Sequence, residues 1–330
     1  MPSAATPSGP VYDLCRAVPE LHRLRAAAQA GDWAAIRAGF TALKDQDDTA
    51  AAARIVAEVP QVDAMLKAAI NAAGDSPDGI LPRTLLAYHH IRIGWAIRTG
   101  YRARYVSASK FARFHEHLRQ AERLLTDVLV LDQHSTLARH LSLMTARGLQ
   151  LGQAEARHRY DHIASVSPGH YYAQSQLLQQ LCPKWSGSWE AAHAFADECR
   201  EAAVPGGLGA VITVEAHLEH WMDISGGRRL LYWRRPGVRD SLIAAAEASV
   251  LHPAHRPNFS RIAVHSVFAA AFSVAGLRSR AFRHFEELGE FSDRQPWGSM
   301  FTLPADEWLR RRAAARRAAR RAEIFGRRPR

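Results

Sequence analysis

An internal similarity with a period of 35 residues constrains the fold of this 330-residue chain more than any other feature. Each copy places an alanine four residues after a glycine, and an aromatic residue four residues after the alanine. The glycine permits a tight turn, the alanine lets two helices approach closely, and the ring fills the groove between hairpins. The matched pairs are Leu143 with Leu178, Gly152 with Gly187, Glu155 with Glu190, Ala156 with Ala191, His158 with His193, Tyr160 with Phe195 and Ala164 with Cys199. The pattern predicts stacked helical hairpins in this part of the chain.

Helical periodicity extends over most of the chain, and the alternation that is typical of strands is scarce. The clearest helix is expected over 111–131, with Ser107 or Ser109 as its N-cap. Its single apolar stripe is formed by Phe111, Phe114, Leu118, Ala121, Leu125, Val128 and Leu131. Further helices are expected over 12–29, 32–44, 48–58, 60–73, 82–98, 133–150, 153–166, 170–181, 188–203, 208–223, 238–251, 258–275, 277–289 and 304–325. We therefore expect an all-α protein with no sheet.

The spacing of Ala156, Tyr160 and Pro168 matches the small, aromatic and proline positions of one known repeat, the tetratricopeptide repeat. The chain thus resembles tetratricopeptide-like helical-repeat proteins over about half of its length. The resemblance implies a right-handed superhelix, or solenoid, of antiparallel helical hairpins whose concave surface binds a protein or peptide. The residues expected to pack the hairpins are Gly152, Ala156, Tyr160, Gly187, Ala191, Phe195, Ala281 and Phe285.

The sequence departs from the tetratricopeptide pattern in the first helix of the repeat. His140, Met144 and Arg147 stand where a consensus repeat has Trp, Gly and Tyr, and the segment 184–188 looks inserted. The segments 31–33 (Gly-Asp-Trp) and 184–189 (Lys-Trp-Ser-Gly-Ser-Trp) resemble an uncharacterised actinobacterial family of domains of unknown function. That second resemblance implies a bacterial protein and no mechanism.

The domain organisation expected from composition has four parts. Residues 1–10 are small, polar and proline-rich and are expected to be disordered, and they lack the basic and apolar regions of a signal peptide. Helical hairpins are expected over 11–74, a helical-repeat domain over 82–303, and an arginine-rich helix or tail over 304–330. The most apolar stretch is interrupted by His265 and is too short to span a bilayer. We expect a cytoplasmic protein without membrane insertion.

The net charge of +11 is concentrated at the C-terminus. Residues 310–330 hold ten of the 43 basic residues and one of the 32 acidic residues, so the remainder has a net charge of +2. Nucleic acid is therefore a candidate partner, because arginines contact phosphates and aromatic rings stack on unpaired bases. The alternative is a solvated helix, together with loops whose rings pack inside. The candidate binding residues are Arg228, Arg229, Tyr232, Trp233, Arg234, Arg235, Arg310, Arg311, Arg312, Arg316 and Arg317, with a second basic-aromatic stretch at 101–105.

The densest group of acids and histidines is a candidate for general acid–base chemistry. It consists of Glu215, His217, Glu219 and His220, although such groups on helices are more often solvated ion-pair faces. The Glu-x-x-His pairs at 155–158 and 190–193 have the spacing of di-iron bundles, but equivalent positions of successive repeats need not meet at one ion. No nucleophile elbow or P-loop is present. We expect no cofactor and, because of the repeat geometry, no metal.

Three functions follow, in order of preference. The first is a non-catalytic helical-repeat scaffold that mediates protein–protein interaction. The second is nucleic-acid binding through the arginine-rich tail and the basic-aromatic loops, and the third is an enzyme that uses His217 and Glu219.

Overall fold

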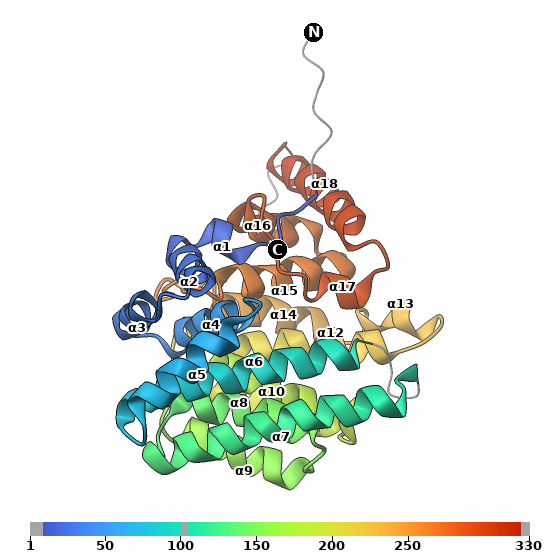
Figure 1. The fold of residues 1–330 in the computed structure, drawn as a ribbon. Helices are drawn as coiled ribbons and strands as arrows, with labels where there is room; N and C mark the ends of the chain where they lie inside the picture. The colour runs from blue at the N-terminus through green and yellow to red at the C-terminus, as the bar shows by residue number, and fades with distance from the viewer. Residues whose placement is uncertain (1–8, 101–104, 325–330) are drawn as a thin grey trace. The chain divides into compact units, whose positions relative to one another are not determined.

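The protein is helical throughout the part that its computed structural model describes, residues 9–100 and 105–324. Within these residues the only extended pairing is an isolated bridge between Val11 and Phe291 (Figure 1). The prediction of an all-α protein without a sheet is thus confirmed for the described residues. Among the same residues, no helix is both long enough and apolar enough to traverse a bilayer.

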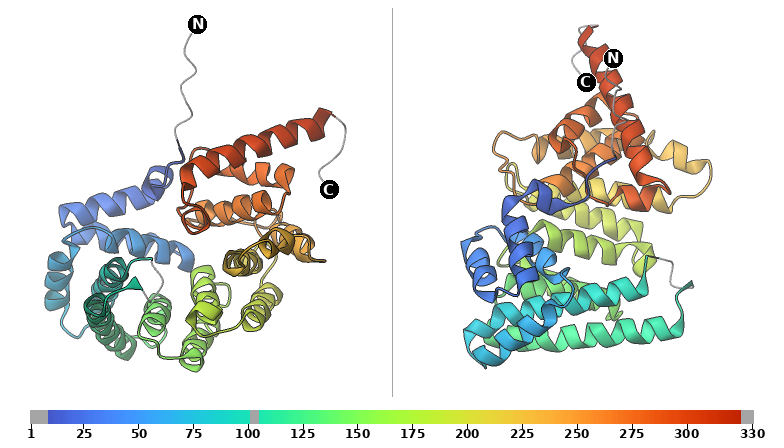
Figure 2. Two further views of the ribbon diagram at one scale, coloured as in Figure 1. Left: turned by 90° about the vertical axis from the view of Figure 1, so that its right-hand side faces the viewer. Right: turned by 45° about the horizontal axis from the view of Figure 1, so that its top comes forward.

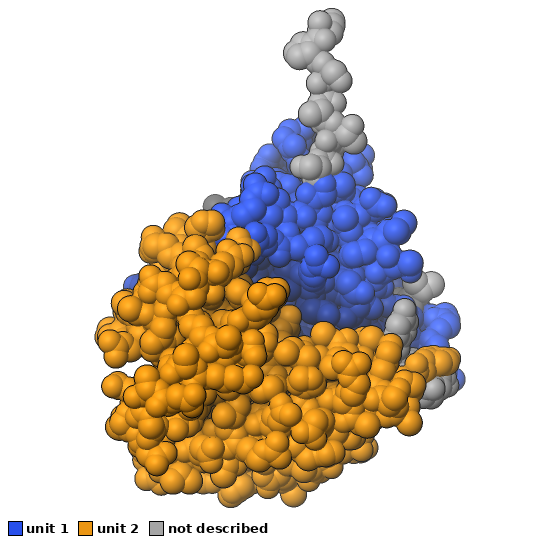
Figure 3. All heavy atoms as spheres, in the orientation of Figure 1, with its two compact units in different colours: residues 1–17, 192–330 blue, residues 18–191 orange. Residues whose placement is uncertain are grey.

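The chain divides into two compact units (Figure 3). The first unit comprises residues 18–191, and the second comprises residues 1–17 together with 192–330. The expected boundary near residues 75–82 is not where the chain divides, because the helices before and after it pack on each other within the first unit. The segment around Val11 belongs with the C-terminal part, since its N–H donates to the Glu290 carbonyl (2.8 Å) and its carbonyl accepts from Ser292 (3.0 Å).

The first unit consists of helices that pack on one another (Figure 2). Neighbours in sequence pack on each other from α5 to α10, and so do the alternate helices α6 with α8 and α8 with α10. The helices are α2 (Pro19–Ala30), α3 (Trp33–Ala42), α4 (Gln46–Ala57), α5 (Val62–Ala73), α6 (Ile80–Arg98), α7 (Ala108–Leu131), α8 (Thr136–Gly148), α9 (Gln153–Ala164) and α10 (Tyr171–Leu181), with 3₁₀ turns at Pro77–Gly79 and Pro183–Trp185. Stacked hairpins and a superhelix remain predictions.

Helix α7 shows how the apolar stripe positions this unit. Five of its seven expected residues, from Phe114 to Val128, are buried, and Ser107 caps the helix by accepting from the Lys110 N–H. Helix α8 approaches α7 at Gly148, where a Cβ atom would stand 2.2 Å from the Leu118 side chain. A larger residue at position 148 would therefore separate the two helices.

The second unit contains the remaining helices. They are α1 (Leu14–Ala17), α11 (Trp189–Ala202), α12 (Val211–Asp223), α13 (Arg228–Tyr232), α14 (Val238–Ala248), α15 (Arg261–Val274), α16 (Arg278–Leu288), α17 (Trp297–Met300) and α18 (Pro304–Ile324), with a 3₁₀ turn at Leu208–Ala210; α11 begins three residues before the unit boundary. The short helices α13 and α17 lie outside the ranges in which helices were expected. Pro19 separates α1 from α2, which were expected as one helix.

The starts of α9 and α11 are one residue further apart than the period of the sequence similarity. Ala156 and Tyr160 are buried in α9, but Ala191 is only half-buried, and the first buried alanine of α11 is Ala192. The expected role of Ala191 is therefore corrected to Ala192, whereas Phe195 is buried as expected. The reason is the turn: seven residues separate α10 from α11, and four separate α8 from α9, while α10 is two residues shorter than α8.

The two glycines of the repeat serve different physical purposes. Gly152 has a φ of +94°, which favours glycine, and a Cβ atom there would meet nothing within 4 Å. Position 187 has no room for a side chain, because a Cβ atom would stand 1.9 Å from the Leu181 carbonyl oxygen. The later copy, Ala281 and Phe285 in α16, is fully buried, and the Phe285 ring contacts Trp308 of α18 at a centroid distance of 5.6 Å.

Candidate functional site

The predicted acid–base cluster lies on α12 of the second unit. His217 and His220 are half-buried, as are Glu215 and Glu219 on the same helix. His217 Nδ1 lies 2.8 Å from the Tyr232 hydroxyl of α13, and His217 Nε2 lies 3.0 Å from Ser241 Oγ of α14. We call His217, Tyr232 and Ser241, together with His193 of α11 and His220, the His217 network.

The direction of the hydrogen bonds in the His217 network decides what it can do. Ser241 Oγ donates to the Val238 carbonyl oxygen at 2.8 Å, so its only hydrogen is used there. The Ser241 oxygen therefore accepts from His217 Nε2–H, and His217 Nδ1 accepts from the Tyr232 hydroxyl. A serine nucleophile requires the opposite direction, in which the hydroxyl gives its proton to histidine. This arrangement orders three helices and does not activate Ser241.

The histidines of this network are held neutral at neutral pH. Burial, and then the neighbouring histidines, lower the pKa of His217 to about 3 and that of His220 to about 4. Burial also lowers the pKa of His193, whose Nε2 lies 2.9 Å from His220 Nδ1, and burial raises the pKa of Tyr232. In the sequence His193 stands out through its Glu-x-x-His pair and its repeat match with His158, and neither feature indicates its contact with α12. The order of the helices is the one signal that could have found it, since α11 and α12 follow each other.

The basic-aromatic segment 228–235 places its rings inside the second unit. Tyr232 and Trp233 are buried, with 1% and 4% of their surface exposed, so their rings are not accessible to an external base. Arg229 stacks on Trp221 at 3.8 Å and Arg235 on Tyr232 at 4.9 Å. Arg228 and Arg234 are exposed. Most of the second stretch, 101–104, lies outside the described residues; Tyr105 is exposed.

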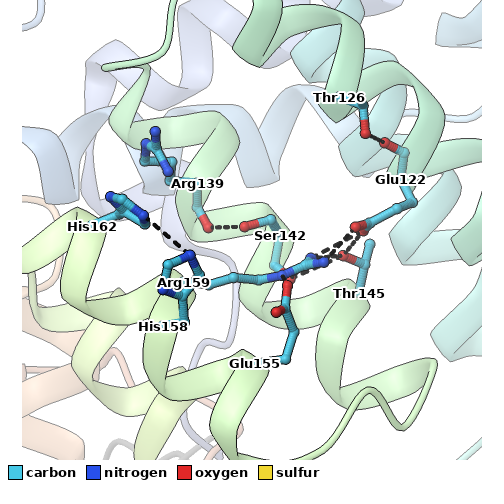
Figure 4. A network of polar contacts seen from close by, with 9 residues as sticks. All are labelled: Glu122, Thr126, Arg139, Ser142, Thr145, Glu155, His158, Arg159 and His162. Carbon is cyan, nitrogen blue, oxygen red and sulfur yellow. Dashed lines mark hydrogen bonds and ion pairs between the residues drawn. The ribbon is translucent and has the colours of Figure 1, made fainter.

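A second polar network joins α7, α8 and α9 in the first unit (Figure 4). Arg159 of α9 forms two parallel hydrogen bonds with the Glu122 carboxylate, at 2.7 and 3.2 Å, and a third with Glu155 at 2.7 Å. It also donates to the Ser142 carbonyl at 2.8 Å, and Thr145 Oγ1 donates to Glu122. We call this set the Arg159 network. Sequence reasoning missed it, because Glu122 lies 37 residues before Arg159.

The Arg159 network includes Glu155, the glutamate of the first Glu-x-x-His pair. The Arg159 hydrogen bond is the largest cause of a lowered pKa for Glu155. In the second pair, the histidine, His193, is hydrogen-bonded to His220. Within residues 9–100 and 105–324, no group of three or more His, Cys, Asp or Glu side chains is placed to hold a metal ion.

Helix α18 presents its predicted arginines in two groups. Arg311 and Arg312 lie half-buried against the aromatic rings of Phe301 (4.7 Å) and Trp308 (4.9 Å). Arg310 is exposed and pairs with Glu307 at 2.6 Å, while Arg316 and Arg317 are exposed, as are Arg320 and Arg321, which the sequence analysis did not single out. The buried side of the helix carries Trp308 and Ala315, so Trp308 is a packing residue of the second unit.

Comparisons with protein families, curated proteins and solved structures give no match to this chain. They therefore support neither the tetratricopeptide resemblance nor the actinobacterial one, and both stay predictions.

Proposed function

We propose that this chain is a helical scaffold that binds another macromolecule and performs no chemistry of its own. The His217 network supports this view, because its hydrogen bonds run away from the arrangement that an activated serine requires. The clearest exposed binding feature is the arginine face of α18. We define this face as Arg316, Arg317, Arg320 and Arg321.

The spacing of the arginine face is the observation that carries a nucleic-acid ligand. Arg316 with Arg320 and Arg317 with Arg321 form two adjacent rows at i and i+4. Like charges at this spacing cost about 0.2–0.5 kcal/mol per pair in a helix, and none of the four arginines forms an ion pair with a described carboxylate. The guanidinium groups thus lie close together on the side of α18 opposite Trp308 and Ala315, where they match the repeated charges of a phosphate backbone.

The composition of the face favours phosphates over a protein surface. Protein interfaces also use arginine, but they combine it with desolvated aromatic anchors such as Trp and Tyr. The exposed large apolar residues of this region are Leu303, before α18, and Ile324, its last residue. From Arg310 to Arg321 the exposed positions carry arginine and alanine only, while the exposed acids Asp306 and Glu323 lie near the two ends of the helix. Such a face supports charge-driven binding that depends little on sequence.

The test is fluorescence anisotropy with a labelled 20-nucleotide single strand and the matching duplex, at several salt concentrations. We expect the R317Q/R320Q/R321Q variant to bind more weakly and to lower the slope of log K against log salt by about two to three, at roughly 0.7–0.9 per lost phosphate contact. The matched control R37Q/R113Q/R119Q removes the same charge from exposed positions elsewhere. Equal losses in the two variants, or no binding by the wild type, would exclude this function.

A protein or peptide partner is the second candidate, and exposed apolar residues of the first unit favour it. Val130 is 82% exposed at the end of α7, and Val166 is 46% exposed just after α9. Since α7, α8 and α9 are consecutive antiparallel helices, both residues belong to the same end of this group. If they contact a partner, V130D/V166D should lose a protein that crosslinks to the wild type, while R317Q/R320Q/R321Q should retain it.

A further inference from the structure

Helix α9 carries an exposed histidine pair on one face. His158 and His162 are four residues apart, so a helix places their side chains one above the other. Their Nε2 atoms lie 3.3 Å apart, and the two rings are nearly perpendicular, at 83° with centroids 4.6 Å apart. In Figure 4 both rings lie on the side of α9 away from Glu122.

The separation of these nitrogen atoms matches the bite of a tetrahedral ion. Two nitrogens bound to Zn²⁺ at about 2.0–2.1 Å with tetrahedral angles stand about 3.3–3.4 Å apart. Square-planar or octahedral angles would bring the nitrogens to about 2.9 Å. The observed 3.3 Å also exceeds the usual range of about 2.7–3.2 Å for a hydrogen bond donated by nitrogen. The separation of the two Nε2 atoms therefore fits two ligands of one tetrahedral zinc ion.

The two arginines that flank His158 on α9 are both paired with carboxylates. Arg159 is bound by Glu122 and Glu155, and Arg157 forms an ion pair with Asp161 at 2.8 Å. The two neighbouring positive charges on α9 are thus compensated by carboxylates. Glu155 is turned toward Arg159, so it is not a third protein ligand to an ion between the histidines.

Exposure distinguishes this pair from the other close histidines of the chain. His265 and His284 have ring nitrogens 3.0 Å apart but are 4% and 1% exposed, so an ion would have to enter the packed interior. His158 and His162 are exposed, and neither ring must leave a packed position to bind an ion.

We propose that His158 and His162 form a zinc site on α9, with the two Nε2 atoms as ligands and the remaining positions open. Each imidazole binds as the Nδ1–H tautomer, which leaves the Nε2 lone pair for the ion. Open positions are filled by water or by a group from another molecule, as in zinc sites that are not closed by four protein ligands. This site is independent of the nucleic-acid proposal.

The test is titration of the full-length protein with Zn²⁺ alone, followed by calorimetry in a buffer that does not chelate. We expect H162Q to weaken the strongest zinc binding by about 10–100-fold, comparable with losses seen when metal sites are perturbed. The matched control H22Q/H134Q removes two other exposed histidines and should leave this binding unchanged. Wild-type affinity in H162Q, or an equal loss in the control, would overturn the site.

A rescue variant tests the geometry itself. Ala154 is exposed four residues before His158, so A154H/H162Q rebuilds the same spacing one turn earlier on α9. We expect this variant to recover zinc affinity to within about tenfold of the wild type. If it binds no better than H162Q, the helical spacing is not what holds the ion, and the proposal fails.

Discussion

The Arg159 network and the His217 network both fasten helices together, but they use opposite electrostatics. In the first, one guanidinium is matched by two carboxylates, with 16% of the Arg159 side chain and 28% of the Glu122 side chain exposed. In the second, the members are neutral rings and hydroxyls, because burial makes the charged forms of its histidines unfavourable. The comparison teaches that similar helix packing can depend on charge in one place and on the absence of charge in another.

The largest effect is expected from breaking the charged network. Arg159→Ala leaves Glu122 partly buried without its guanidinium, and removing one partner of such a pair costs about 3 kcal/mol or more of unfolding free energy. The control is Arg157→Ala on the same helix, whose pair with Asp161 is exposed and worth less than about 1 kcal/mol. Urea unfolding at pH 7 measures both, and similar losses would mean that the Arg159 network adds nothing beyond a surface pair.

The second prediction uses pH to separate the two networks. His217 has a folded pKa of about 3, below its ordinary 6.5, so between these values the unfolded chain binds a proton that the native chain does not. Stability therefore falls as pH decreases from about 6.5, by up to about 1.4 kcal/mol per pH unit for one histidine. Glu155 has a lowered pKa, so its contribution is present at pH 5–7 and is lost only as pH falls below its ordinary value of 4.5.

We therefore expect His217→Gln to lower the slope by up to about 1.4 kcal/mol per pH unit, the share of one histidine, and Arg159→Ala to leave the slope unchanged between pH 7 and 5. Unfolding free energies from urea titrations at pH 7, 6 and 5 give the slopes. A wild-type slope in His217→Gln would contradict the neutral, buried state of this ring.

The smallest effect is expected from the hydroxyl of the neutral network. Tyr232→Phe removes the donor to His217 Nδ1 and keeps the buried ring, so it should cost about 1–2 kcal/mol for one unsatisfied acceptor. His217 also bonds to Ser241, so the packing of α12 should be retained. Thermal unfolding followed by circular dichroism checks this. A loss as large as that of Arg159→Ala would remove the distinction drawn between the two networks.

Much of the secondary structure could be predicted from local patterns. The expected helix at 153–166 is found at Gln153–Ala164, and that at 277–289 is found at Arg278–Leu288. These succeeded because helical periodicity and glycine turns are properties of short segments. The one-residue error at Ala191 arose because sequence similarity ignored how the 3₁₀ turn before α11 changes its starting point.

The candidate sites were predicted less well, because their partners are distant in sequence. The acid–base cluster was found on α12, yet Tyr232 and Ser241 decide the hydrogen-bond direction of His217. The arginines of α18 could be counted, but which of them stack on Phe301 and Trp308 depended on how the helix packs.

Helix positions, turn glycines and the separation of charge between the C-terminal arginines and the rest were thus readable from the amino acids alone. They depend on interactions within a few residues. The folded chain alone decided the capping of α10, where Asp47 accepts hydrogen bonds from the Tyr172 N–H and from His170 across more than a hundred residues. A carboxylate there is held by the N–H groups that begin a helix, and only packing brings the two together.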